Sequence, residues 1–527
     1  MEEDILYGKK RHFFGGIAPS NMLNFKATYD EATSKTTIRA TLPKDTIIDD
    51  QMICCVGGAV IRKKNDGYPK DEFDGEFVAD ITTDKTVTLT GKDAKYRYYA
   101  AFPYSKQGVY NRNVVNRSLV INIPTYTYLY GYDLNLNDPD TSTRVYYPDD
   151  VDNNGDKFTP AGMDFESGAF SYGDWPSEAG VKFMPRPCML KYDGTRDYYL
   201  DPNDYTKKAD GTASDVANTS YGGNAMMEWP KIYTKRWEEN GIYHFRCSDA
   251  KIDSEYECWC NYDKNNNEIN RFYTAIYQGV KSGDRLRSIS GAAPTTSVSM
   301  STFKTYAQAN STDHDIAVIS DRLLITDLLV MITRTTDLQS AIGIGARTAG
   351  TIYSSGTLNA KGMFWGSNVT GNTTDPVKVF GMENWWGNKD QFLLGWCSSG
   401  GTQAFKFTRG TKDGSTVFEY NYTSSVTGYK TGILPTTVIS SGANYTSGYV
   451  DECVTTKFGR IPSSINGSGS LYECDFLQLS TLSRVSTVSH VGDSGHLDGG
   501  PFQYNVGESP SSNSKIGASL SCKPSAT

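Results

Sequence analysis

DIAVISDRLLITDLLVMITRT, residues 315–335, is the stretch that decides the fold class of the second half of the chain. Its apolar residues recur every three or four positions, which is the spacing of a helix. The preceding stretch SMSTFKTYAQAN, residues 299–310, has the same spacing, and Ser299 or Ser301 is placed to cap it. We expect the longer helix to lie in the core, with Asp327 either capping or pairing.

Strands and turns surround these two predicted helices. KIYTKRWEENGIYHFRCS, residues 231–248, predicts a hairpin that turns at Asn240-Gly241, because both turn positions need positive φ angles. EYECWCNYDKNNNEINRFYTAIYQG, residues 255–279, predicts two more strands around a polar loop. After about residue 350, strand-like runs again alternate with glycine turns, up to KIGASLSCK at 515–523. Two helices in a turn-rich, largely antiparallel region predict an α+β arrangement.

The first part of the chain predicts a separate all-β unit. Residues 19–123 hold runs such as TTIRATLP and TVTLTG between turn sequences, which is typical of an antiparallel sandwich. Residues 124–185 are rich in Asp, Asn and Pro, so we expect a connector with little core of its own. Within it, DVDNNG at 150–155 begins like a calcium loop, but the twelfth position is Ala161 rather than an acid. A solvated turn is expected there.

Composition and charge exclude several classes of function. The 527 residues carry a net charge of −8 and no basic stripe, so nucleic acid is not expected as a partner. The most apolar run, residues 323–332, is too short to span a bilayer, so no membrane insertion is expected. The first residues hold no apolar run of signal-peptide length. A location outside the cell would therefore require lysis or a dedicated export system.

The ten cysteines lack the paired spacing of a zinc site. Cys54 and Cys55 are adjacent, and an alternating strand through CWC at 258–260 would send Cys258 and Cys260 to one face. A disulfide framework is not expected in so large a chain without a signal sequence. We therefore predict buried free thiols.

GDSGHLDGGPF, residues 492–502, contains the letters of a trypsin-like nucleophile motif interrupted by HLD. A catalytic Ser494 would need a His and an Asp far from it in the chain, and His490 and His496 are too close to serve. The insertion would also reshape the oxyanion turn. The segment therefore predicts an exposed, glycine-hinged polar loop rather than a protease. No metal is expected at the chance cluster of His490, Asp493, His496 and Asp498.

Glycoside cleavage needs two carboxylates at a set separation, which the sequence does not show. Asp204, Asp253 and Glu383 are the acids considered, and none stands out. No phosphate-binding GxxxxGKS loop is present in the sequence. The residues therefore predict no enzyme and no cofactor, and a surface-polysaccharide hydrolase remains as the enzymatic alternative.

GMENWWGN, residues 381–388, together with IGASLSCK at 516–523, resembles the C-type-lectin-like domains of bacteriophage tail proteins and prophage receptor-binding proteins. Distant relatives of those domains are the formylglycine-generating-enzyme type of lectin fold and the tropism determinants that retroelements diversify. MPRPCMLKYDGTRDYYLDPNDY, residues 184–205, and TLNAKGMFWG, residues 357–366, are further similar pieces. The front unit resembles the fibronectin type III modules of phage tails through YYAAFPYSKQGVYN, residues 98–111.

The resemblance implies a mainly β protein in four parts. Residues 1–18 would attach it to a virion, and residues 19–123 would form an immunoglobulin- or fibronectin III-like sandwich. Residues 124–185 would connect that sandwich to a C-type-lectin-like host-binding domain with two helices, residues 186–527. Trp385 and Trp386 could form a sugar platform, but in the resembling domains this motif lies in the core, so a core position is expected.

In the resembling family, the last segment before the final core strand forms the surface that meets the host. The counterparts here are residues 489–502, 505–515 and 516–520, with Val491-Gly492 standing near the place of an absent Arg-Gly-Gly element. Aromatic rings such as Tyr504 and His496 suit stacking on sugars, and amides and carboxylates suit hydrogen bonds to hydroxyls. The resemblance implies an exposed receptor-binding face made of Gln478, Ser480, Ser483, Arg484, Ser486, His490, Asp493, Ser494, His496, Asp498, Gln503, Tyr504, Asn505 and Asn513.

The expected function is that of a non-enzymatic phage adhesin, carried on the tail or another exterior appendage of the virion. Its partners would be a bacterial surface glycan or protein, and other virion proteins bound through the N-terminus. A homotrimer is expected from the resemblance, because weak single sites gain from multivalency. The alternative is a structural head-decoration or baseplate protein without direct receptor binding.

Overall fold

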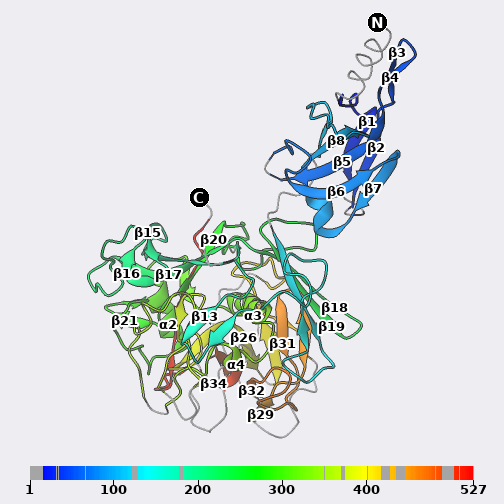
Figure 1. Ribbon diagram of the computed structural model, residues 1–527. Coiled ribbons are helices and arrows are strands. Elements are labelled where there is room, and N and C mark those ends of the chain that lie inside the picture. Colours follow the sequence, from blue (N-terminus) through cyan, green and yellow to red (C-terminus); the bar gives the residue numbers. More distant parts are fainter. Residues whose placement is uncertain are drawn as a thin grey trace. The chain divides into compact units, whose positions relative to one another are not determined.

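The computed structural model consists of two compact units, residues 1–125 and 126–527, each with its own apolar core (Figure 1). Both units are mainly β, as the sequence predicted. The structure describes residues 16–30, 33, 35–65, 67–120, 128–176, 182–348, 351–368, 374–399, 401–416, 428–434, 445–480, 482, 484–488, 504–509 and 511–525.

The strands of the first unit form two antiparallel sheets. One sheet has the order β1 (Asn24–Asp30), β2 (Lys35–Thr41), β7 (Lys85–Leu89). The other has the order β6 (Glu76–Ile81), β5 (Val56–Lys64), β8 (Tyr98–Ser105), β9 (Arg117–Leu119). A hairpin of β3 (Thr46–Ile48) and β4 (Gln51–Cys54) and the 3-10 turn η1 (Gly91–Lys95) complete the unit.

Alternation along the strands builds the core of this unit. In β2, Thr36, Ile38 and Ala40 are buried, and the residues between them are exposed or half-buried. Ile61 and Tyr99 from the four-stranded sheet are also fully buried. Because inward side chains from both sheets join one cluster, the two sheets are held by a single apolar layer.

The second unit contains three larger sheets. The seven-stranded sheet has the order β16 (Asp204–Lys208), β15 (Arg196–Asp201), β14 (Arg186–Lys191), β17 (Gly223–Pro230), β20 (Arg271–Ala275), β36 (Leu520–Cys522), β23 (His314–Ile316). The four-stranded sheet has the order β11 (Val145–Tyr146), β10 (Leu129–Asn135), β19 (Ile242–Ser248), β18 (Tyr233–Glu239).

The eight-stranded sheet is formed mainly by the last third of the chain. It has the order β28 (Lys430–Thr431), β27 (Thr402–Phe405), β26 (Asp390–Ser399), β33 (Arg484–Val488), β34 (Tyr504–Glu508), β32 (Phe476–Ser480), β29 (Tyr445–Tyr449), and β35 (Ile516–Gly517) pairs with β26. Four short pairs complete the strands: β12 (Gly162–Asp164) with β13 (Ala169–Ser171), β21 (Val280–Ser282) with β22 (Arg285–Arg287), β24 (Lys378–Val379) with β25 (Met382–Glu383), and β30 (Cys453–Thr456) with β31 (Gly459–Pro462).

Both helices predicted from the sequence are present, as α2 (Met300–Gln308) and α3 (Ile319–Thr333), followed by the short α4 (Leu338–Ile342). Ser299 caps α2, because its side chain accepts a hydrogen bond from the backbone N–H of Thr302. Every residue of α3 is buried, and the helix lies in the interior of the large unit (Figure 1). A helix buried all round needs apolar residues on all its faces, which its sequence supplies.

Asp327 of α3 forms an ion pair with Arg236. Pairing was one of the two roles expected from the sequence, and capping was the other. The Asp327 carboxylate accepts a hydrogen bond from Arg236 Nε at 2.7 Å, and from the hydroxyls of Tyr132 at 2.8 Å and Tyr243 at 3.1 Å. These three partners lie on β18, β10 and β19. The ion pair therefore joins the central helix to the four-stranded sheet.

The predicted connector at 124–185 is wrong for the residues that the structure describes there. Tyr132, Tyr147, Trp175 and Phe183 lie in the largest apolar core of the second unit. β10 also pairs along its whole length with β19. The segment is rich in Asp, Asn and Pro, but its spaced aromatic residues bury large areas, and that burial decides its place in the fold.

Two local predictions in 231–279 have different outcomes. The hairpin at Asn240-Gly241 is confirmed, since both residues have positive φ angles of 54° and 75° and β18 pairs with β19 across them. Only β20 forms in residues 255–279, whereas CWC at 258–260 is not part of a strand and is buried at all three positions. The alternating strand expected for CWC is therefore wrong.

All ten cysteines are free thiols, and eight are buried, as predicted.

Within the described ranges, no helix has the length and apolar character that crossing a membrane requires.

His314 of β23 makes the stability of the second unit depend on pH. The side chain is fully buried, its Nδ1 lies 2.8 Å from Ser311 Oγ, and Nε2 has no hydrogen-bonding partner among the described residues. Burial, with Arg409 nearby, lowers the pKa of His314 to about 4 despite the nearby Asp313. The unfolded chain, with a histidine pKa of about 6.5, therefore takes up the proton first as the pH falls.

We expect His314 to stabilise the fold fully above about pH 6.5 and to lose about 3 kcal/mol of that contribution between about pH 6.5 and 4. Urea denaturation at several pH values measures this loss by tryptophan fluorescence, because all eight tryptophans lie in the second unit. A His314→Gln variant should show a flatter pH dependence across that window. An unchanged slope in the variant would contradict the assignment.

Candidate functional site

The strands that hold the predicted receptor-binding residues lie side by side in the eight-stranded sheet. β34 lies between β33 and β32 in that sheet. Gln478 is paired with Asn505 in the parallel register of β32 and β34, and Val488 with Tyr504 in the antiparallel register of β33 and β34. Two segments separated in sequence are thus brought together, and residues 489–503 connect the paired ends of β33 and β34.

Part of the predicted receptor-binding face is wrong, because two of its residues are buried. Ser480 and Ser486 are fully buried, and Ser486 donates a hydrogen bond to the carbonyl of Leu393 on β26. These two serines are therefore not exposed, because their strand positions point into the sheet packing rather than to solvent. Gln478 and Arg484 are half-buried on the same strands.

Asn513 is half-buried and shapes a turn. Its Oδ1 accepts a hydrogen bond from the N–H of Lys515 at 2.8 Å, and its carbonyl accepts from the N–H of Ser297 at 2.9 Å. The structure describes only the backbone of Tyr504 and Asn505. The remaining predicted positions lie outside the described residues: Ser483, His490, Asp493, Ser494, His496, Asp498 and Gln503.

The GMENWWGN motif lies mostly in the core, as expected. Trp386 is fully buried, and its Nε1 donates a hydrogen bond to the carbonyl of Gly343 at 3.1 Å. Trp385 is half-buried, and the guanidinium carbon of Arg322 lies 3.4 Å from the centroid of a Trp385 ring. Neither indole forms an open platform for a sugar, because Trp386 is enclosed and Arg322 covers Trp385.

A cavity of about 60 Å³ lies beside this motif, lined in part by Asp321, Glu383, Asn384 and Trp385. Ligand sites for small molecules have volumes of roughly 300–1,000 Å³, so this cavity is too small for a saccharide. Both side-chain polar atoms of Asn384 are buried without a partner among the described residues. The cavity is a small gap in the packing with a mainly apolar lining, rather than a binding site for a surface glycan.

The three acids considered for glycoside cleavage have separate structural roles. Burial raises the pKa of Glu383, whose carboxylate accepts hydrogen bonds from the N–H groups of Gly356 and Leu358. Asp204 accepts a hydrogen bond from the hydroxyl of Thr206, two residues along the same strand β16. Asp253 lies 3.7 Å from Lys235 Nζ. The three carboxylates therefore lie at separate places in the fold, and each contacts its own partners.

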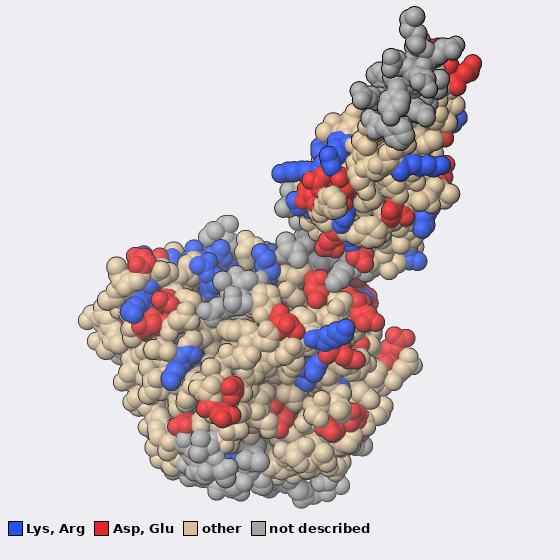
Figure 2. Space-filling view, in the orientation of Figure 1, with Lys and Arg blue, Asp and Glu red and all other residues tan. Residues whose placement is uncertain are grey.

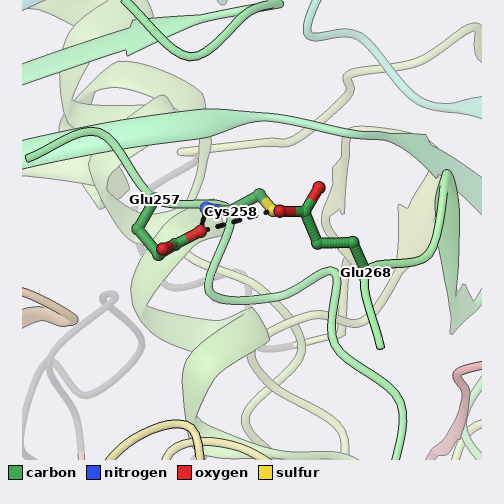
Figure 3. A group of neighbouring side chains, drawn as sticks. All are labelled: Glu257, Cys258 and Glu268. Atoms are coloured by element: carbon green, nitrogen blue, oxygen red, sulfur yellow. Dashed lines mark hydrogen bonds between the residues drawn. The ribbon is translucent and has the colours of Figure 1, made fainter. Parts of the chain in front are cut away.

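Glu257, Cys258 and Glu268 form the one group of metal-type ligands found in the described parts of the chain, with ligand atoms within 4.8 Å of one another (Figure 3). Burial and the two glutamates raise the pKa of the Cys258 thiol to about 12, whereas metal binding needs a thiolate. Cations already lie within 3.7 Å of the carboxylates, namely Lys231, Lys251 and Lys412. The group is an ion-pair network, and we assign no metal to it.

The calcium-like DVDNNG segment is bonded to the neighbouring sheet. Asp150 pairs with Arg246 of β19 at 2.9 Å. Asn153 is fully buried and exchanges two hydrogen bonds with the backbone of Gly131 on β10. These oxygens are used within the protein, so the segment is a structural turn and less solvated than expected.

A groove of about 570 Å³ at one end of the seven-stranded sheet was missed by the sequence analysis. It is formed where β14 and β20 begin and β15 and β17 end, because these neighbouring strands are antiparallel. Its volume lies within the range of ligand sites. Much of the wall is apolar and includes Met184, Pro185, Pro187, Leu200, Pro202, Pro230 and Met363.

Glu228 forms the polar floor of this groove, which we call the strand-end groove. The side chain is 6% exposed, and its carboxylate contacts Arg196 Nη1 at 2.8 Å and Arg271 Nη1 at 3.3 Å. It also accepts hydrogen bonds from the hydroxyls of Tyr199 at 2.7 Å and Tyr273 at 2.9 Å. The single carboxylate of the groove is therefore fully compensated from within the protein.

Basic side chains predominate around this floor. Lys182, Arg186 and Arg271 line the groove and are exposed, against the one acid Glu228. On the face shown in Figure 2, basic and acidic side chains are interspersed, without a continuous basic stripe. The local excess of positive charge distinguishes the strand-end groove from that mixed surface.

Strand pairing explains why the sequence did not reveal this groove. Arg186 stands opposite Glu228, and Glu228 opposite Tyr273, only through the register of β14, β17 and β20. The one local signal was the pair of prolines that flank Arg186 in MPRPCMLK. No protein-family model matches the chain, and neither does any curated protein.

Proposed function

We propose that the protein is a non-enzymatic phage adhesin that binds a glycan or protein on a bacterial surface. The observation that carries the proposal is the convergence of β32, β33 and β34. These strands hold Gln478 and Asn505 next to one another, and Val488↔Tyr504 pairing joins the ends of the connection 489–503. A polar, glycine-rich connection anchored by paired strands suits the display of side chains to a partner.

The strand order of the first unit supports a fibronectin III-type spacer. Successive strands cross between a three-stranded sheet of β1, β2 and β7 and a four-stranded sheet of β6, β5, β8 and β9. This is the two-sheet antiparallel arrangement that fibronectin type III and immunoglobulin domains share. In the proposed adhesin, this unit separates the host-binding unit from the virion.

Two features of the second unit support a C-type-lectin-like frame. Trp386 of the GMENWWGN motif is a core residue, and the C-terminal strand β36 lies inside the seven-stranded sheet, between β20 and β23. The chain end therefore contributes to the core of the second unit. Attachment through residues 1–18, a homotrimeric state and a location on the virion exterior belong to the same proposal.

The experiment replaces residues 489–503 by a Gly/Ser sequence of equal length in the phage. We expect assembled virions to contain the protein in normal amount and to lose at least about 90% of adsorption to host cells, since binding energy concentrates in few side chains. The matched control replaces the exposed turn 210–212 and should leave adsorption unchanged. Normal adsorption with defective assembly would instead favour a structural head-decoration or baseplate protein.

A further inference from the structure

We infer that the strand-end groove is a binding site for an anionic glycan, whose carboxylate or phosphate group is held by Arg186 and Arg271. This inference goes beyond the proposed adhesin function, because it assigns a ligand class to a site on a different sheet from β32, β33 and β34. It rests on the shape of the groove, on the exposed Arg186 side chain that is held against Tyr199, and on the charge of the lining.

Arg186 is prepared to bind an anion. Its guanidinium carbon lies 3.5 Å from the centroid of the Tyr199 ring, so the side chain is held against an aromatic face. The Arg186 side chain is exposed, and none of its guanidinium nitrogens forms a hydrogen bond or ion pair with a residue in the described part of the chain. A guanidinium in this state offers its N–H donors in the planar arrangement that carboxylate and phosphate oxygens accept.

Glu228, the one acid in the lining of the groove, is already paired within the protein. The remaining positive charge of the groove is therefore available to a ligand. Glu228 is compensated by Arg196 at 2.8 Å, and two tyrosine hydroxyls occupy further positions on its carboxylate. Arg271 lies at the rim, 47% exposed, 3.3 Å from Glu228 Oε1. An incoming anion therefore meets two exposed guanidinium groups and no unpaired carboxylate in the lining.

The size and wall of the groove favour a saccharide over a simple ion. A volume of about 570 Å³ holds several sugar rings or their equivalent, whereas a lone anion would need far less. The apolar faces of sugar rings pack on apolar side chains, and the wall offers Met184, Leu200 and four prolines. The same wall provides few donors for a neutral polyhydroxyl ligand, so the charged group supplies the specificity.

The test uses the purified full-length protein and an array of bacterial surface glycans. The array contains three sets, with uronic-acid, phosphodiester and neutral units respectively. We expect binding to one or both anionic sets, with little binding to the neutral set and weaker binding at high salt. The preference between the first two sets identifies the anion as carboxylate or phosphate.

Arg186→Gln and Arg271→Gln should each weaken binding of the captured glycan at least about tenfold. Arg186 has no ion pair within the protein, so its loss should leave the fold intact, which tryptophan fluorescence checks. Arg39→Gln, an equal charge change on an exposed position of β2, is the matched control and should bind as the unchanged protein does. Absence of binding to both anionic sets, equal binding by Arg186→Gln, or equal capture of neutral glycans would overturn the inference.

Because this assay uses isolated protein, its result is independent of virion adsorption. A strand-end groove that binds no anionic glycan would leave the proposal for residues 489–503 standing. Conversely, unchanged adsorption after replacement of 489–503 would leave the groove assignment standing.

Discussion

Glu473→Ala is expected to lower the free energy of unfolding of the second unit by about 3–5 kcal/mol. Glu473 is 1% exposed and lies between two arginines that are 0% exposed. Arg460 binds it through two hydrogen bonds of 2.6 and 3.1 Å, and Arg144 through one of 3.2 Å. Removing the carboxylate leaves two buried positive charges without their counter-ion, which is the costly way to disrupt a buried ion pair.

Urea denaturation followed by tryptophan fluorescence measures this loss, since the first unit has no tryptophan. Glu166→Ala is the matched control, because Glu166 is exposed in a turn and its loss should change stability by no more than about 0.5 kcal/mol. Burial alone would raise the pKa of Glu473, but the two arginines outweigh it and hold that pKa below its ordinary value. The contribution is therefore present at neutral pH and lost as the pH falls through the acid range. A Glu473→Ala midpoint equal to that of the control would contradict this account.

Asp327→Leu is expected to cost a similar amount, about 3–5 kcal/mol, for a related reason. The substitution leaves Arg236, which is 1% exposed, without its partner inside the unit. It also removes the acceptor of two tyrosine hydroxyls, those of Tyr132 and Tyr243. Because Asp327 lies on α3, the change loosens the contact between the central helix and the four-stranded sheet.

The double variant Asp327→Leu with Arg236→Met separates the cost of a broken pair from the cost of altered packing. Replacing both charges by apolar residues removes the unpaired guanidinium, so we expect it to recover at least half of the lost stability. Recovery should be incomplete, since the two hydroxyls still lack their acceptor. A double variant as unstable as Asp327→Leu alone would show that packing around α3, rather than the buried charge, causes the loss.

Periodicity and turn chemistry predicted much of the local structure correctly. The helical spacing of 299–310 and 315–335 corresponds to α2 and α3, and Asn240-Gly241 forms the predicted turn. These features depend on contacts between residues close in sequence, which a pattern of a few positions contains. CWC at 258–260 failed because its burial comes from distant neighbours rather than from strand alternation.

The candidate sites were predicted less well, because they depend on long-range strand pairing. The resemblance placed Gln478 and Asn505 on one surface, and the register of β32 and β34 does bring them together. It also placed Ser480 and Ser486 there, although both are buried. The predicted connector failed for the same reason, since its aromatic residues find their partners far away in the chain, on strands such as β19.

The sequence by itself determined the mainly β composition, the two helices, the hairpin turn and the free thiols, because each follows from local spacing or from residue type. Only the tertiary structure decided that Arg186, Glu228 and Arg271 line one groove, and that Glu473 lies between Arg144 and Arg460. Those groups are well separated in the chain, and the register of β14, β17 and β20 places Arg186 opposite Glu228 and brings Arg271 within 3.3 Å of the Glu228 carboxylate. Register depends on how whole faces of a sheet are buried, so no short stretch of residues contains it.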